Sequence, residues 1–178
     1  MLTFRELVDG ADDAGTRRRL LAGKVEDMLN TVVRQVAFHN FETRLHESRR
    51  TAELTAEEIS DIWMDTQRAA LGPAVKTGDD YRPIWGYVPH FVHTPFYVYA
   101  YAFGDCLVNA LWQSYAGARD AGGTDAFVAR YRELLCAGGT ERYDVALRRF
   151  GLDPRDPAFW SMGLDMISGM IDELEGLS

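Results

Sequence analysis

The sequence of 178 residues is poor in cysteine and proline, with two and six respectively, and it has no long hydrophobic run. A transmembrane helix needs roughly 18 or more consecutive apolar residues, and no basic segment followed by an apolar run opens the chain. We therefore expect no membrane partner and a soluble, cytoplasmic protein. Cys106 and Cys136 lie in apolar helical patterns without nearby metal-ligand partners, so we expect both thiols to be reduced and buried.

Positive charge is also scarce, because 19 lysines and arginines stand against 27 aspartates and glutamates, for a formal net charge of −8. The basic clusters Arg17–Arg19 and Arg49–Arg50 are too short to attract a phosphate backbone against this background. The motifs G-x-x-x-x-G-K, G-x-S-x-G and C-x-x-C do not occur. We therefore expect no nucleic-acid partner and find no support for nucleotide hydrolysis, serine hydrolase chemistry or thiol redox chemistry.

Apolar residues at helical spacing are abundant. They predict a long, buried helix from Thr16 to about Ser48, and the capping box that starts at Thr55 predicts a second helix that stops at Gly72-Pro73. Further helices are predicted at about 1–8, 95–118, 124–137, 140–151 and from Asp156-Pro157 onward. Because no strand is required, we expect an all-α fold: one multi-helix, bundle-like domain over residues 1–178, with a single long irregular connection at about 72–94.

The segment Tyr81–Phe103 contains nine aromatic residues and two of the four histidines. Its prolines predict an extended approach from Tyr81 to Thr94, after which Thr94 would cap a helix with Pro95 at its first position. On that helix Tyr97 and Tyr101 would share a face, while Tyr99 would point elsewhere. The phenols and imidazoles could form a polar-tipped core or a set of donors aimed into a cleft, and the residues alone favour the core.

His39, Glu42 and His46 fall three and four residues apart on one face of the first long helix. This spacing allows a metal site, although a di-iron bundle would require Glu-x-x-His on paired helices. The spacing favours instead a paired, partly buried structural face.

Several strings resemble the C-terminal part of the oligoendopeptidase F group, zinc metallopeptidases related to thimet oligopeptidase. They cover nearly the whole chain: Gly23–Phe38, Phe41-Glu42, Ile62-Trp63, Leu71–Pro73, His90–Ala102 and Asp156–Trp160. The resemblance implies an oligopeptide substrate and a helical lobe that carries the substrate-binding half of an active site. It also places the region of Glu42 and His46 close to the active-site helices, as support for the site.

Zinc in that group is bound by an H-E-x-x-H helix and a later glutamate, and the glutamate of the motif is the general base. Neither His39, His46, His90 nor His93 belongs to such a motif. Because Met1–Leu7 resembles the segment just after the glutamate ligand, we expect the chain to begin downstream of every zinc ligand, to hold no zinc and to be inactive alone. The uncapped start further suggests a homo-oligomer formed through exposed apolar surface.

The resemblance implies roles for five residues. His90, Tyr97 and Tyr101 would be catalytic donors, and His93 and Tyr99 would bind substrate. Alternatively, the chain is a non-catalytic all-helical scaffold or a peptide-binding module that keeps the aromatic cleft without chemistry.

Overall fold

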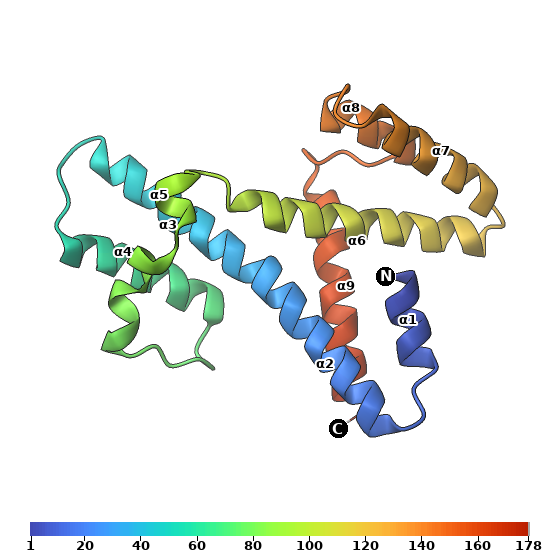
Figure 1. The fold of residues 1–178 in the computed structure, drawn as a ribbon, viewed down its shortest axis with the longest axis horizontal. Coiled ribbons are helices and arrows are strands. Elements are labelled where there is room, and N and C mark those ends of the chain that lie inside the picture. Colours follow the sequence, from blue (N-terminus) through green and yellow to red (C-terminus); the bar gives the residue numbers. More distant parts are fainter. Residues whose placement is uncertain (178) are drawn as a thin grey trace. The chain divides into compact units, whose positions relative to one another are not determined.

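The computed structural model describes residues 1–177, and all of their regular structure is helical (Figure 1). In order, the elements are α1 (Leu2–Asp9), α2 (Ala14–Thr31), α3 (Val33–Arg49), α4 (Ala56–Leu71), η1 (Asp79–Tyr87), α5 (His90–His93), α6 (Tyr99–Asp120), α7 (Thr124–Ala137), α8 (Tyr143–Leu147), η2 (Arg148–Phe150) and α9 (Pro157–Glu175). Here η marks a 3₁₀ helix. No strand occurs in residues 1–177, and the all-α prediction is confirmed.

The described chain forms two compact units. The first joins Met1–Val25 to the chain from Asp105 onward, and the second is Glu26–Gly104. That residues 1–178 form a single domain stays a prediction.

The second unit is built on the packing of α3 against α4 (Figure 1). Its core consists of Phe38, Phe41, Ile59, Trp63, Met64 and Val98. The Trp63 indole donates to the carbonyl of Tyr81 at 3.0 Å, and the Trp85 indole donates to Ser60 Oγ at 3.0 Å. These two bonds attach η1 to α4, since a buried indole N–H needs an acceptor.

The capping box at Thr55 is confirmed. The Thr55 hydroxyl accepts from the Glu58 N–H, and the Glu58 carboxylate accepts from the Thr55 N–H. The predicted stop is also correct, because Gly72 ends α4 with φ of 68°, a conformation that glycine adopts without steric cost.

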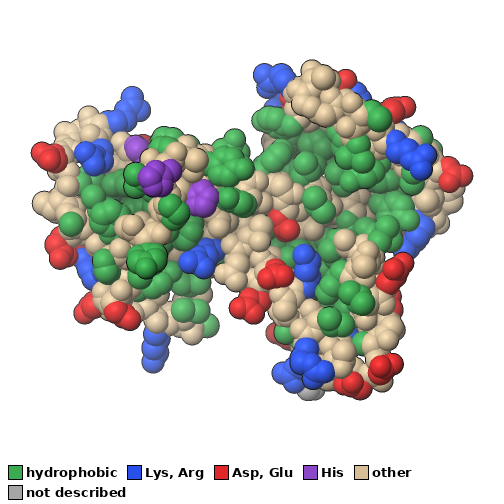
Figure 2. Space-filling view, in the orientation of Figure 1, with side chains coloured by type: hydrophobic (Ala, Val, Ile, Leu, Met, Phe, Trp, Pro, Cys, Tyr) green, Lys and Arg blue, Asp and Glu red, His purple; other side chains and the backbone are tan. Residues whose placement is uncertain are grey.

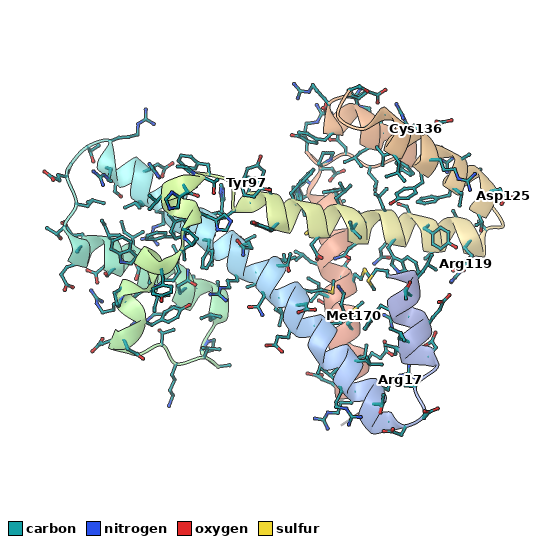
Figure 3. All side chains as sticks on the ribbon, in the orientation of Figure 1. Arg17, Tyr97, Arg119, Asp125, Cys136 and Met170 are labelled. Atoms are coloured by element: carbon teal, nitrogen blue, oxygen red, sulfur yellow. The ribbon has the colours of Figure 1, made fainter. Side chains whose placement is uncertain are left out.

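The first unit packs α9 with α1, with the start of α2 and with most of α6. Glu173 of α9 pairs with Arg5 of α1 at 2.6 Å and with Arg17 of α2 at 2.7 Å. Figure 3 shows Met170, which is fully buried, on the same helix. The predicted start of α9 is confirmed, because Asp156 caps it by accepting from the Ala158 N–H at 2.9 Å.

α9 also makes a close approach to α6. A Cβ added at Gly163 would lie 3.0 Å from both Cα and Cβ of Cys106. Burial, with a smaller contribution from the charge of Asp105, raises the pKa of the Cys106 thiol to about 11. Cys136 on α7 is exposed, so the prediction that both thiols are buried is wrong for this residue (Figure 3).

The predicted helix from Thr16 to Ser48 is interrupted. Val32 separates α2 from α3 and has φ of −99° and ψ of −67°. The run Thr31-Val32-Val33 is β-branched throughout, and such residues disfavour helix. The predicted helix is also not buried throughout, since its apolar residues Leu29 and Val36 are exposed.

The predicted irregular connection at 72–94 is wrong over much of its length, because it contains η1 and α5. Pro83 lies inside η1, and Pro89, with φ of −64°, serves as the N-cap of α5, where the fixed φ of proline suits a helix start. Thr94 ends α5 instead of capping the next helix, and α6 begins at Tyr99.

The predicted start of α7 at Thr124 is confirmed, with Gly123 before it. The next helix starts later than predicted. The Thr140 hydroxyl donates to the carbonyl of Ala137, and α8 begins only at Tyr143. Leu164, an apolar residue of α9, is exposed. None of the helices in residues 1–177 combines the length and the apolar character that a membrane span requires.

Candidate functional site

Three side chains of the second unit meet at the start of α6: His90, Tyr97 and Tyr101. The Nε2 atom of His90 lies 3.0 Å from the Tyr101 hydroxyl, within hydrogen-bonding distance. The Tyr97 ring lies parallel to the His90 ring, with centroids 6.3 Å apart, and perpendicular to the Tyr101 ring at 5.5 Å. We call these residues the His90 cluster.

The phenols of the His90 cluster are exposed, with Tyr97 at 50% and Tyr101 at 39% of their full accessible surface. The core interpretation that the residues alone favoured is therefore wrong for these tyrosines. In Figure 2 histidine side chains gather on one face of this unit among hydrophobic side chains. The cluster offers hydroxyl and imidazole groups, which can donate and accept hydrogen bonds, to a molecule outside the unit.

The backbone before α6 turns sharply to place Tyr97. Phe96 has φ of 61°, the only positive φ at a residue other than glycine in the described chain. This conformation is costly for a residue with a Cβ. Its N–H donates to Glu42 Oε1 at 2.7 Å, and Glu42 is only 1% exposed. Figure 3 shows Tyr97 on this segment between α5 and α6.

The face of α3 that carries His39, Glu42 and His46 contacts the same segment. The His46 ring lies 4.7 Å from the Phe96 ring, and the His39 ring lies 6.1 Å from the Tyr99 ring. The sequence identified this face but missed that Glu42 binds the backbone of Phe96. The available signal was one acid, Glu42, between two histidines on one face of a helix.

The two predicted substrate-binding residues lie apart from the His90 cluster. His93 is exposed at the last position of α5. Tyr99 is also exposed, and its ring contacts His39. The structure thus brings together three of the five predicted site residues.

A cavity of about 410 Å³ adjoins the His90 cluster. His90 and Tyr101 line it together with Tyr87, and the opposite side is formed by the end of α2 and the start of α3. The polar residues of that side are Asn30, Thr31, Arg34 and Gln35. We call it the Arg34 cavity; its volume is in the range typical of small-ligand sites.

The described residues present no set of ligands that fits a zinc ion. Among residues 1–177 no group of three or more histidine, cysteine, aspartate or glutamate side chains is arranged to hold a metal. A structural or catalytic zinc needs at least three protein ligands. His39 Nδ1 and Glu42 Oε2 are buried and have no hydrogen-bond partner in the described chain, but they lack a third ligand.

Comparison with known proteins identifies the family. The profile described as "Peptidase family M3" matches residues 1–166. Oligopeptidase PepF of Bacillus subtilis is 28% identical over 96% of this chain, and the plasmid-borne oligoendopeptidase F of Lactococcus lactis subsp. cremoris is 26% identical over 99%. The chain spans only 25% and 28% of the length of these relatives.

A solved structure agrees with this result. The crystal structure of oligoendopeptidase-F from Enterococcus faecium superposes with a TM-score of 0.84 and 26% identity, over 98% of this chain and 32% of that one. The sequence match and the shared all-helical fold cover nearly the same residues. The chain therefore belongs to peptidase family M3.

Proposed function

We propose that this chain is the substrate-binding lobe of a zinc-dependent oligoendopeptidase, with an oligopeptide as substrate. In this proposal the metal ligands and the general base belong to the part of the longer relatives that this chain does not cover. The observation that carries the proposal is the exposed His90 cluster, supported on a turn that the buried carboxylate of Glu42 holds.

The cluster has the chemistry that peptide hydrolysis needs from such a lobe. As the scissile carbonyl becomes tetrahedral, its oxygen gains negative charge and requires hydrogen-bond donors. Tyr97 is half exposed, and its hydroxyl makes no hydrogen bond with a residue of the described chain. We assign this phenol as the donor to the developing oxyanion.

Tyr101 and His90 have complementary roles in this proposal. The bond between Tyr101 and His90 Nε2 fixes the orientation of the imidazole. His90 then holds the parallel ring of Tyr97 and binds the peptide backbone beside it. His93 and Tyr99 are exposed further along the same segment and would contact more distant residues of the peptide.

The test is Tyr97→Phe in an active enzyme, made by joining this chain to the upstream catalytic portion of an oligoendopeptidase F relative. Removing one oxyanion donor lowers kcat by about 10²–10³-fold with little change in KM. Tyr131→Phe is the matched control, because Tyr131 is an exposed tyrosine on α7 in the other unit. A Tyr97→Phe enzyme with near-normal kcat and a lowered melting temperature would reassign Tyr97 to a structural role.

The alternative function is a peptide-binding module without chemistry. It is favoured by one observation, that residues 1–177 offer no group of side chains that fits a metal. Joining the catalytic portion decides between the two functions. A module would bind peptides with unchanged affinity before and after joining, and the joined protein would not cleave them.

A further inference from the structure

We propose that the Arg34 cavity is a subsite for a carboxylate group of the peptide, with Arg34 as the binding cation. The identification of the ligand as a peptide rests on the proposed function. The binding of a carboxylate to Arg34 does not depend on it. The shared chemistry is a carboxylate, which a peptide can supply from its C-terminus or from an acidic side chain.

The lining of the Arg34 cavity is positively charged. The chain as a whole is acidic, with 27 aspartates and glutamates against 19 lysines and arginines. Yet no aspartate or glutamate lines this cavity, and Arg34 is its one permanently charged residue. The other polar groups there include the side-chain amides of Asn30 and Gln35, which can donate hydrogen bonds to an anion. A cavity with this lining favours a negative group over a neutral or positive one.

Arg34 lies over a buried aromatic ring. Its guanidinium carbon lies 5.3 Å from the centre of the Phe38 ring, and Phe38 is a buried core residue. An arginine stacked on a ring keeps the edges of its planar fork free for a carboxylate, and less side-chain freedom is lost on binding.

Arg34 also differs from the two arginines of its unit that form ion pairs. Arg44 pairs with Asp65 at 3.3 Å, and Arg82 pairs with Asp61 at 2.8 Å. Within the described chain Arg34 has no carboxylate partner. An oriented cation without a counter-ion can form the charge-assisted, bidentate bond that arginine makes with carboxylates.

The Arg34 cavity shares two residues with the His90 cluster. His90 and Tyr101 belong to both. A peptide whose reacting carbonyl lies at Tyr97 would therefore place a neighbouring residue or its own C-terminus in the cavity. The subsite would select peptides that carry a carboxylate close to the cleaved bond.

The experiment is a titration of the isotopically labelled chain with three acetylated tripeptides, followed by NMR. One is Ala-Ala-Ala with a free C-terminal carboxylate, the second is Ala-Glu-Ala amide, and the third is Ala-Gln-Ala amide, which has no carboxylate. We expect one or both of the acidic peptides to shift the resonances of Gln35 and His90, and the third peptide to bind at least about tenfold more weakly.

Arg34→Gln should lower the affinity for the acidic peptides by about tenfold or more. Arg34→Lys should lower this affinity by an intermediate factor, because lysine keeps the charge but lacks the planar guanidinium. Arg44→Gln, on the same helix and with the same change in charge, is the matched control. Binding of the free-acid peptide alone identifies the C-terminus as the source, and binding of the glutamate peptide alone identifies a side chain.

The proposal is overturned if all three peptides bind with equal affinity, or if the Arg34→Gln chain binds the acidic peptides as tightly as the parent chain. Because the readout is binding to the chain itself, these results are independent of catalysis. If the peptide titrations disprove the carboxylate subsite but Tyr97→Phe strongly lowers kcat, the proposed function stands. If Arg34 binds the carboxylate but Tyr97→Phe leaves kcat near normal, the subsite stands without the proposed function.

Discussion

Glu42 and Phe96 are 54 residues apart in the sequence, and the carboxylate of the first accepts the backbone N–H of the second at 2.7 Å. The bond occurs where the backbone of Phe96 is left-handed, with φ of 61°. That conformation costs roughly 1–2 kcal/mol for a residue with a Cβ. A hydrogen bond contributes about 0.5–1.5 kcal/mol net, which offsets a large part of this cost.

The first prediction follows from this bond. Glu42→Gln keeps an acceptor oxygen, whereas Glu42→Leu leaves the Phe96 N–H without one. We expect the Phe96 amide to be protected from hydrogen exchange in the parent chain and in Glu42→Gln, and to exchange at least about tenfold faster in Glu42→Leu. NMR exchange rates at Phe96 measure this directly. Equal protection in all three proteins would show that Glu42 does not hold the turn.

The close approach of α9 to α6 gives a second prediction. Alanine in a helix interior normally stabilises by about 0.5–1 kcal/mol relative to glycine. At Gly163 the added methyl would meet the backbone of Cys106 at 3.0 Å, so we expect Gly163→Ala to lower the free energy of unfolding by about 1–3 kcal/mol.

Gly169, on the same helix, provides the control, because its added Cβ meets no atom within 4 Å. Gly169→Ala should raise the free energy of unfolding by the usual amount of about 0.5–1 kcal/mol. Urea denaturation measures both changes, and a stabilising Gly163→Ala would contradict the packing of α9 against Cys106.

A third prediction concerns pH. Hydrogen bonds from Arg17 and then from Arg5 hold the pKa of Glu173 below its ordinary value of 4.5. A lowered pKa in the folded state means that the ionised carboxylate stabilises the fold above about pH 4.5. This stabilisation is lost as the pH falls below that value through the lowered pKa. Its size is no more than about 1 kcal/mol, since water and salt screen partly exposed pairs.

We therefore expect Glu173→Gln to lower the melting temperature at pH 7, and this difference from the parent chain to shrink as the pH falls below 4.5 through the lowered pKa. Glu175→Gln, at an exposed position of the same helix, should have little effect across this range. A Glu173→Gln difference that does not shrink on acidification would assign the loss to packing instead of charge.

The two cysteines should differ in reactivity. The thiolate is the reactive form, and the buried thiol of Cys106, with its pKa raised to about 11, is nearly all protonated at pH 8. Iodoacetamide should therefore modify the exposed Cys136 in the folded chain and both residues in urea. Mass spectrometry of the peptides counts the modified sites, and rapid modification of Cys106 in the folded chain would contradict its burial.

Local chemistry made part of this fold predictable from the sequence. The capping box at Thr55, the glycine that ends α4 at Gly72 and the Asp156-Pro157 start of α9 each depend on residues a few positions apart. The break at Val32 was missed, because each β-branched residue disfavours helix only slightly and the surrounding apolar pattern is continuous.

The candidate site was predictable to a lesser extent. His90, Tyr97 and Tyr101 meet, as their proposed roles require, although Tyr97 lies before α6 and not on it. The left-handed turn at Phe96 could not be predicted, because the carboxylate that binds it is far away in the sequence. The roles assigned to these residues, the homo-oligomer and the cytoplasmic location stay predictions.

The geometry of the His90 cluster affects the NMR chemical shifts of its three rings. Aromatic ring currents shield protons that lie above a ring plane and deshield protons at its edge. The perpendicular rings of Tyr97 and Tyr101, at 88°, and the parallel rings of His90 and Tyr97, at 6°, therefore place each ring in the anisotropic field of another. The proton chemical shifts of these three rings therefore report on the geometry of the cluster. They will change together if a peptide separates the rings.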